Sequence, residues 1–132
     1  MVKDGYDFSF SGLKTSVVNF VRKNPDVSDV DIAASFQEAV VDVLLTKAQR
    51  AVKEYGAKGL CLAGGVAANS SLRERTLDLA VNDGIAAFVP DRSMCTDNAA
   101  MVAAAGWWRM HSDGPAPLDQ GASSSLRLPT YA

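Results

Sequence analysis

The sequence predicts an α/β fold in which short parallel strands are flanked by helices. Two short apolar runs bounded by glycine or proline, residues 58–63 and 85–89, have the composition of strands buried on both faces of a sheet. A segment with helical spacing separates these runs, and further helical segments precede the first run and follow the second. This alternation is typical of parallel strands joined by a right-handed crossover connection.

The composition limits the class of protein. A chain of 132 residues with 48% hydrophobic and 21% charged side chains has the size and balance of a small globular domain. Its net charge of −2 lacks the signature of a non-specific nucleic-acid binder, so a nucleic-acid partner would need a local patch or a second subunit. No apolar stretch approaches the roughly 20 residues that span a bilayer, and the first residues resemble no secretory or transit signal. We therefore expect a cytoplasmic protein without a membrane partner.

The first half of the chain is predicted to form two helices. Residues 7–10 alternate like the end of a strand, and Ser11 is then a candidate N-cap for an amphipathic helix that ends at Asn24. Ser28 begins a second helix, whose apolar residues keep helical spacing until Gly56 supplies a C-cap. At 1.5 Å per residue this second helix is about 40 Å long.

The second half is predicted to alternate strands with helices. Two glycines turn the chain after the first strand into a helix over residues 67–82, and a last helix covers residues 96–110. The sequence thus predicts a domain over residues 1–112 and an extended tail over residues 113–132. A two-stranded parallel sheet does not stand alone, so we expect this domain to be part of a larger α/β unit.

Gly64, Gly65 and Asn69 form the first candidate binding segment. A strand that ends in two glycines and opens a helix presents backbone N–H groups and the positive end of the helix dipole. This arrangement suits a phosphate, and Asn69, about one turn into the helix, is placed to hydrogen-bond a ligand. The pattern is neither a Walker loop nor a dinucleotide fingerprint. The alternative is a tight turn in which Asn69 is merely solvated.

A second loop, residues 90–99, should leave the same edge of the sheet, because parallel strands deliver their carboxyl ends to one side. In this loop Asp97 is either a metal ligand or the cap of the following helix. His111, the sole histidine, lies 14 residues further along that helix, roughly 21 Å away, and so does not share a metal with Asp97. If Asp97 binds a metal, its other ligands lie outside this chain.

Several other residues have a structural interpretation beside a functional one. Lys14 opposes the dipole of its predicted helix, so it either faces a ligand or an acidic group or is simply solvated. We interpret the pair Trp107 and Trp108 as core or interface aromatics rather than a base-stacking platform. Arg73 and Arg75 are interpreted as a solvated helix face. Cys61 and Cys95 lie in no metal-binding pattern, and we expect two reduced, mostly buried thiols.

Four segments together resemble one known family, the tRNA threonylcarbamoyladenosine transferases, formerly called glycoproteases. The segments are residues 7–15 (DFSFSGLKT), 31–37 (DIAASFQ), 64–69 (GGVAAN) and 95–101 (CTDNAAM). The resemblance extends over residues 7–110 and corresponds to the C-terminal part of the family's proteins.

The resemblance implies a partial ribonuclease-H-like domain of the actin, sugar-kinase and Hsp70 superfamily. It also implies transfer of a threonylcarbamoyl group from threonylcarbamoyl-adenylate to N6 of adenosine 37 in tRNA, in a complex with accessory subunits. By match to the family motif, Asn69 would contact the adenylate or ATP, and Gly64 and Gly65 would line its cleft. Asp97 would ligate a divalent metal, iron.

The sequence departs from the family pattern in two features. It contains neither the family's two metal-binding histidines, spaced His-x-x-x-His, nor the first phosphate-contacting glycine loop. A single carboxylate does not hold a catalytic metal, so we expect the chain to need a missing N-terminal domain and to be inactive alone. The alternatives are a non-catalytic module that docks on a partner subunit and half of another ATP-binding member of the superfamily.

Overall fold

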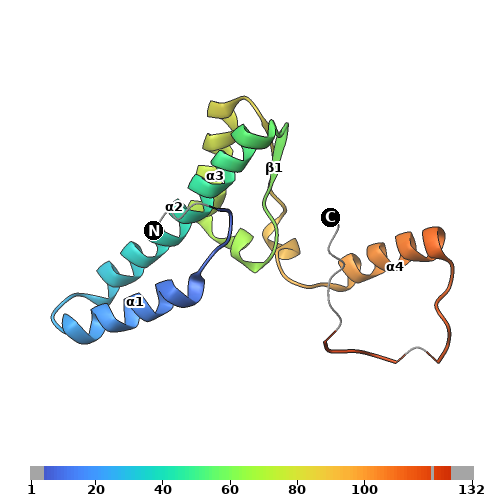
Figure 1. Cartoon of the computed structure of the whole chain (residues 1–132), viewed down its shortest axis with the longest axis horizontal. Helices are drawn as coiled ribbons and strands as arrows, with labels where there is room; N and C mark the ends of the chain where they lie inside the picture. The colour runs from blue at the N-terminus through green and yellow to red at the C-terminus, as the bar shows by residue number, and fades with distance from the viewer. Residues whose placement is uncertain (1–4, 120, 126–132) are drawn as a thin grey trace. The chain divides into compact units, whose positions relative to one another are not determined.

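The computed structural model describes residues 5–119 and 121–125. The chain forms two compact units, Met1–Thr96 and Asp97–Ala132. In chain order, the first unit contains α1 (Phe10–Lys23), α2 (Asp29–Tyr55), β1 (Gly59–Cys61), η1 (Gly65–Ala68), α3 (Ser70–Asp83), β2 (Ala86–Phe88) and η2 (Arg92–Met94), where η is a 3-10 turn, and the second contains α4 (Ala99–Asp113). Figure 1 labels α1 to α4 and β1.

The predicted α/β class is confirmed. Strands β1 and β2 pair in parallel, with Gly59 opposite Ala86 and Cys61 opposite Phe88, and α3 connects them. Within the described residues the sheet has these two strands, flanked by helices, as expected for part of a ribonuclease-H-like domain.

The strand end predicted at residues 7–10 is wrong. Phe10 already begins α1, and its ring stacks on that of Phe8 with 5.6 Å between the centroids. The first helical hydrogen bond runs from Leu13 N to the Ser9 carbonyl, so Ser9 occupies the N-cap position that the sequence assigned to Ser11. The two aromatic residues of this short alternating pattern, Phe8 and Phe10, stack on each other instead of packing in a strand.

Helix α2 confirms the sequence prediction at both ends. The Ser28 hydroxyl accepts a hydrogen bond from Val30 N, and Gly56 closes the helix in the left-handed conformation at φ 60°. Both ends follow from local chemistry: a serine oxygen satisfies a free amide of the first turn, and glycine adopts positive φ without a steric penalty.

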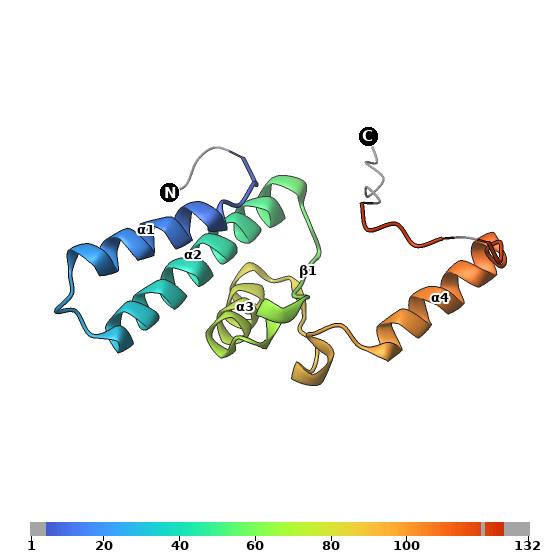
Figure 2. The ribbon, with the colours of Figure 1, turned by 90° about the horizontal axis from the view of Figure 1, so that it is seen from below.

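The main core lies between α2 and α3, which pack against each other and lie next to each other in Figure 2. Buried Val41 and Leu45 of α2 meet buried Leu72 of α3, and Leu62, just after β1, packs against them. Arg75 of α3 extends this contact at its margin by binding Glu38 at 2.9 Å and Asp42 at 2.6 Å. The interpretation of Arg75 as part of a solvated helix face missed these two ion pairs, although the Arg75 side chain is still 35% exposed.

The sheet is covered on one face, which corrects the prediction that its strands are buried on both faces. Leu60 is half-buried, whereas Cys61 is exposed and Phe88 is 63% exposed. Because side chains alternate along a strand, Leu60 lies on one face of the sheet and Cys61 and Phe88 lie on the other. Cys95 is buried as expected, but Cys61 is not, and both thiols are free.

The second unit contains α4, which ends at Asp113 before Gly114. Trp107 and Trp108 are 59% and 70% exposed, so their interpretation as core residues is wrong, while an interface role stays a prediction. Residues 114–119 and 121–125 of the predicted tail form neither helix nor strand, and its remaining residues lie outside the described part. Among the described residues, no helix combines the length and hydropathy needed to cross a membrane.

Candidate functional site

The two loops that follow the strands lie together, as the sequence predicts. Because β1 and β2 are parallel, residues 62–69 and 89–95 leave the same edge of the sheet. Arg73 of α3 joins the two loops: its Nη1 donates to the Ala67 carbonyl at 3.0 Å and to the Pro90 carbonyl at 2.7 Å. The interpretation of Arg73 as solvated is wrong, since this contact is partly buried.

The glycine turn leaves open space at its surface. Gly64 has φ 78° and ψ 176°, a conformation that is essentially restricted to glycine. Gly65 begins the 3-10 turn η1 with an ordinary negative φ. Apart from each glycine and its two chain neighbours, no atom of the described residues lies within 4 Å of the position that a Cβ would take at either glycine. A ligand can therefore approach the backbone of this turn closely.

The helix begins later than the sequence predicts. The chain does not pass from the two glycines directly into α3, because η1 intervenes and α3 starts at Ser70. Within η1, Ala67 N donates to the Gly64 carbonyl at 2.9 Å and Asn69 N donates to the Val66 carbonyl at 3.0 Å. These two amides are used inside the turn, so the turn offers fewer amides to a ligand than expected.

Asn69 is the N-cap of α3, and it is half-buried rather than solvated. Its Oδ1 accepts from Leu72 N at 2.9 Å, and its Nδ2 donates to Gln37 Oε1 of α2 at 2.9 Å. Because a backbone N–H can only donate, the Leu72 contact determines which way the Asn69 carboxamide points. Nδ2 carries two hydrogens, and among the described residues its one acceptor is Gln37, so the second hydrogen can bind a ligand hydroxyl or carbonyl.

Positive charge gathers near the N-terminus of α3. Arg92, from η2, is exposed, and its Nη2 donates to Ser70 Oγ at 2.8 Å. The helix dipole places partial positive charge at the same end of α3. Both contributions favour an anionic ligand beside the glycine turn.

Sequence reasoning missed Gln37, Arg73 and Arg92 as parts of this site. Gln37 belongs to the second family-like segment, but nothing in that segment indicates its partner. The spacing of Arg73 could have indicated its role. Residues four apart share one face of a helix, so Arg73 lies on the same face as Asn69. Arg92 could have been noticed as a cation in the loop of residues 90–99, which was already predicted at this edge of the sheet.

Asp97 lies in the second unit and is exposed. It does not cap α4, because Asn98 does so: Asn98 Oδ1 accepts from Met101 N at 3.0 Å. The capping alternative for Asp97 is therefore wrong. Across residues 5–119 and 121–125, no three His, Cys, Asp or Glu side chains gather where they could hold a metal ion. The described residues therefore contain no three-ligand cluster of this kind, and the role of Asp97 as a metal ligand stays a prediction.

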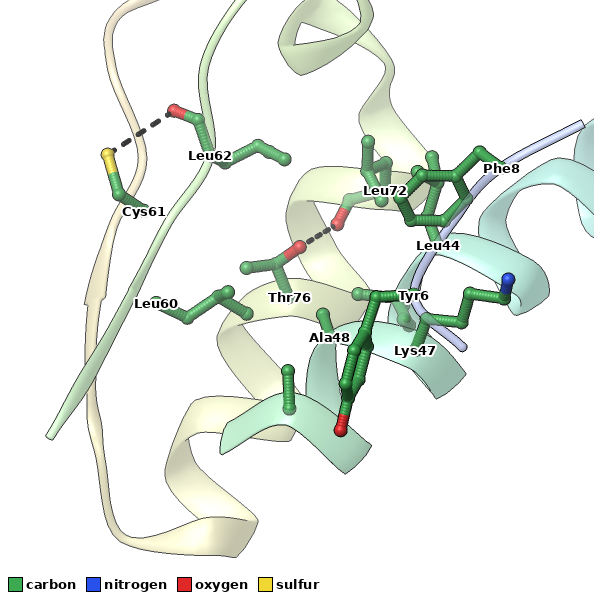
Figure 3. Close-up of a pocket in the computed structure, with 12 residues that line it drawn as sticks. Tyr6, Phe8, Leu44, Lys47, Ala48, Leu60, Cys61, Leu62, Leu72 and Thr76 are labelled. Atoms are coloured by element: carbon green, nitrogen blue, oxygen red, sulfur yellow. Dashed lines mark hydrogen bonds between the residues drawn. The ribbon is translucent and has the colours of Figure 1, made fainter. Parts of the chain in front are cut away.

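The N-terminal segment docks on α2 through cation–π contacts. Lys47 is 93% buried, donates to the Asp7 carbonyl and lies 5.2 Å from the centroid of the Phe8 ring. Arg50 donates to the Gly5 carbonyl and lies 4.7 Å from the centroid of the Tyr6 ring. Beneath this segment is a mainly apolar cavity of about 320 Å³ (Figure 3). Lys14, in contrast, is exposed.

We expect Tyr6 to ionise at a higher pH than an ordinary tyrosine. Its phenol donates to Glu54 Oε2 at 2.5 Å, and this hydrogen bond raises the pKa of Tyr6 above its ordinary value of 10.0. A raised pKa in the folded state means that the contribution to stability is complete below about pH 10 and is lost as the pH rises through the folded-state pKa. Absorbance at 295 nm, measured as wild type minus Tyr6→Phe, should show this late transition.

Glu54→Gln is the matched control for this titration. It keeps an acceptor for the Tyr6 phenol but removes the carboxylate charge, so the late transition should move toward about pH 10. A wild-type difference transition at or below about pH 10 would contradict the role of Glu54.

Known proteins match this chain over most of its length. The sequence model of the family described as TsaD, tRNA N6-adenosine threonylcarbamoyltransferase, matches residues 1–104. A relative of that name from Carboxydothermus hydrogenoformans is 52% identical over 126 residues, which are 96% of this chain and 38% of the relative. A relative of the same name from Clostridioides difficile is 45% identical over 130 residues, which again cover 96% of this chain and 38% of the relative. The one from Bacillus cereus is 54% identical over 108 residues, 78% of this chain and 32% of the relative.

These matches confirm the family resemblance that the four segments indicated. The chain spans well under half of the length of these relatives, between 32% and 38%. The matched region includes the glycine turn, Asn69 and Asp97. The chain belongs to the tRNA N6-adenosine threonylcarbamoyltransferase family.

Proposed function

We propose that this chain forms the adenylate-binding wall of an enzyme that makes threonylcarbamoyladenosine in tRNA. The observation that carries the proposal is the open Gly64–Gly65 turn beside the oriented carboxamide of Asn69, in a chain of this family. The backbone of the turn would lie against the nucleotide, and the second Nδ2 hydrogen of Asn69 would bind a hydroxyl or carbonyl oxygen of the adenylate. Arg92 would stabilise its phosphate by charge.

The proposed reaction is an acyl transfer. N6 of adenosine 37 attacks the carbonyl carbon of the threonylcarbamoyl group, and the bond from that carbon to the phosphate oxygen of the adenylate breaks. AMP leaves with the electron pair, and N6 loses one proton. The contribution of this chain is to hold the adenylate in place, because fixing a reactant in the reactive geometry removes much of the entropic barrier.

A complete enzyme needs more than the described residues supply. We propose Asp97 as one ligand of an iron ion whose other ligands come from elsewhere in the enzyme. The tRNA and the accessory subunits would bind the assembled enzyme in the cytoplasm. The chain alone should therefore form no threonylcarbamoyladenosine.

Equilibrium binding of Mg·ATP to the purified 132-residue chain tests the proposed wall. We expect saturable binding of one nucleotide, measured by calorimetry, with GTP as the control for the base. Gly65→Val should abolish the binding, because its side chain would fill the space over the turn, and circular dichroism should confirm that the variant folds. A folded wild-type chain that binds no adenine nucleotide would refute the assignment.

A second function, docking on a partner subunit without catalysis, is favoured by the exposed apolar face of the sheet. Phe88 is 63% exposed there, beside exposed Cys61. Sedimentation analysis separates the two functions: a chain that self-associates or captures a purified accessory subunit, yet binds no nucleotide, would favour docking.

A further inference from the structure

We propose that Arg73 is a positioning residue that fixes the two loops of the candidate site, residues 62–69 and 89–95, in place relative to each other. The expected effect of Arg73 on nucleotide binding rests on the proposed function. The expected effect of Arg73 on the two loops rests on the contacts of its guanidinium group alone. Arg73 touches no ligand position, so it acts through the loops it joins.

The guanidinium group of Arg73 contacts the loops at three points. Nη1 donates to the Ala67 carbonyl at 3.0 Å in the first loop and to the Pro90 carbonyl at 2.7 Å in the second. The same atom lies 3.9 Å from the buried Cys95 sulfur, which itself lies 3.4 Å from the Asp91 carbonyl oxygen. One charged group thus reaches both loops and the end of the second.

Each loop is a local turn that closes on itself. In the first loop Ala67 N donates to the Gly64 carbonyl, and in the second Met94 N donates to the Asp91 carbonyl, both at 2.9 Å. Such bonds determine the shape of each turn but not the position of one turn relative to the other. That position depends on contacts between them. Arg92 of the second loop binds Ser70, directly after the first loop, at an exposed point, and Arg73 joins the two loops at a partly buried point.

We call the contacts of Arg73 with the two loops the Arg73 clamp. The position of Arg73 on α3 connects this clamp to Asn69, the candidate ligand contact. Arg73 N donates to the Asn69 carbonyl at 3.1 Å, one helical turn from the cap. A buried carbonyl without a donor is costly, and Ala67 is fully buried, so loss of Arg73 should drive the first loop to rearrange. The cap Asn69 closes that loop and would move with it.

Arg75 offers a matched control on the same helix. It also forms two contacts through its guanidinium group, but these go to Glu38 and Asp42 of α2 and not to a residue of either loop. Arg75→Ala removes the same charge and a similar volume. It should reduce stability without loosening the loops.

Amide hydrogen exchange of the 132-residue chain tests the clamp directly. In Arg73→Ala, exchange of the Ala67 and Asn69 amides in one loop and the Met94 and Cys95 amides in the other should accelerate together, about tenfold or more. The same amides should keep their wild-type rates in Arg75→Ala. Unchanged loop amides in a folded Arg73→Ala chain, or acceleration in one loop alone, would overturn the proposal.

Nucleotide affinity provides the functional readout. Mg·ATP should bind Arg73→Ala about tenfold more weakly than the wild type, whereas Arg75→Ala should bind normally even where its melting temperature falls. Arg73→Lys, whose ammonium group can still donate to carbonyls, should recover part of both readouts and replaces the alanine variant if that chain does not fold. Equal affinity losses in the Arg73 and Arg75 variants would reduce Arg73 to a general stabilising residue and overturn the proposal.

The two readouts fail separately. If the wild-type chain binds no Mg·ATP but both loops loosen in Arg73→Ala, the proposed function is wrong and the clamp stands. If nucleotide binds and the loops do not depend on Arg73, the clamp is wrong and the proposed function stands.

Discussion

Replacing Gly64 by alanine is expected to lower the free energy of unfolding by about 1–3 kcal/mol, because φ 78° with ψ 176° is strained for any residue with a Cβ. The cost does not come from crowding, since no atom of the described residues beyond the two chain neighbours lies within 4 Å of the added methyl group. It comes from the backbone of the residue itself. Chemical denaturation of Gly64→Ala and the wild type, followed by circular dichroism, measures the difference.

Gly65→Ala is the matched control for this strain. Gly65 has the same open space around it but an ordinary negative φ, so its substitution should change the free energy of unfolding by less than about 0.5 kcal/mol. The added methyl group would still project where the proposed nucleotide approaches, and should weaken Mg·ATP binding about tenfold. Equal destabilisation by the two substitutions would show that the Gly64 conformation is not what the turn requires.

Asn69→Asp is expected to keep the fold and to weaken Mg·ATP binding on the order of 100-fold. The aspartate oxygen still accepts from Leu72 N, and aspartate is as good an N-cap as asparagine. The Gln37 carboxamide can rotate and donate to the new carboxylate. The ligand, however, loses the Nδ2 donor and meets a negative charge beside its phosphate. Calorimetric titration and a melting curve of the same sample separate the two effects.

Asn69→Ala and Asn69→Ser complete the series at this position. Alanine removes the cap as well as the donor and should cost about 1 kcal/mol of stability. Serine retains a capping oxygen but has no amide donor, so it should bind nucleotide weakly while folding normally. Wild-type affinity in Asn69→Asp would exclude Asn69 from the nucleotide site.

The helix ends could be predicted from the sequence where a capping side chain or glycine acts on its own neighbours. This holds for Ser28 and Gly56 of α2, and for the glycine after α4. It fails where two candidates stand close together. Ser9 occupies the position assigned to Ser11, and Asn98 caps α4 in place of Asp97, because the choice depends on the path of the preceding chain.

The candidate site could be predicted only in outline. The sequence located the glycine turn and Asn69, and parallel pairing of the strands confirmed that both loops leave one edge of the sheet. The sequence did not reveal that Asn69 caps α3 or that Gln37 orients its carboxamide. Residues 37 and 69 are distant in sequence, and periodicity carries no information about such a pair.

By itself, the sequence determined the α/β class, the long helix α2, the parallel strands and the family to which the chain belongs. The fold class, the helix and the strands depend on apolar periodicity and on local turn chemistry, which a few neighbouring residues specify. The family followed instead from the resemblance of four segments to a known family. Only the tertiary structure decided the partners of Arg73 and Arg75, the open face of the sheet and the orientation of Asn69. A charged side chain exposed in the unfolded chain has many equivalent surroundings, and its role is decided when packing brings a buried carbonyl or an opposite charge within reach.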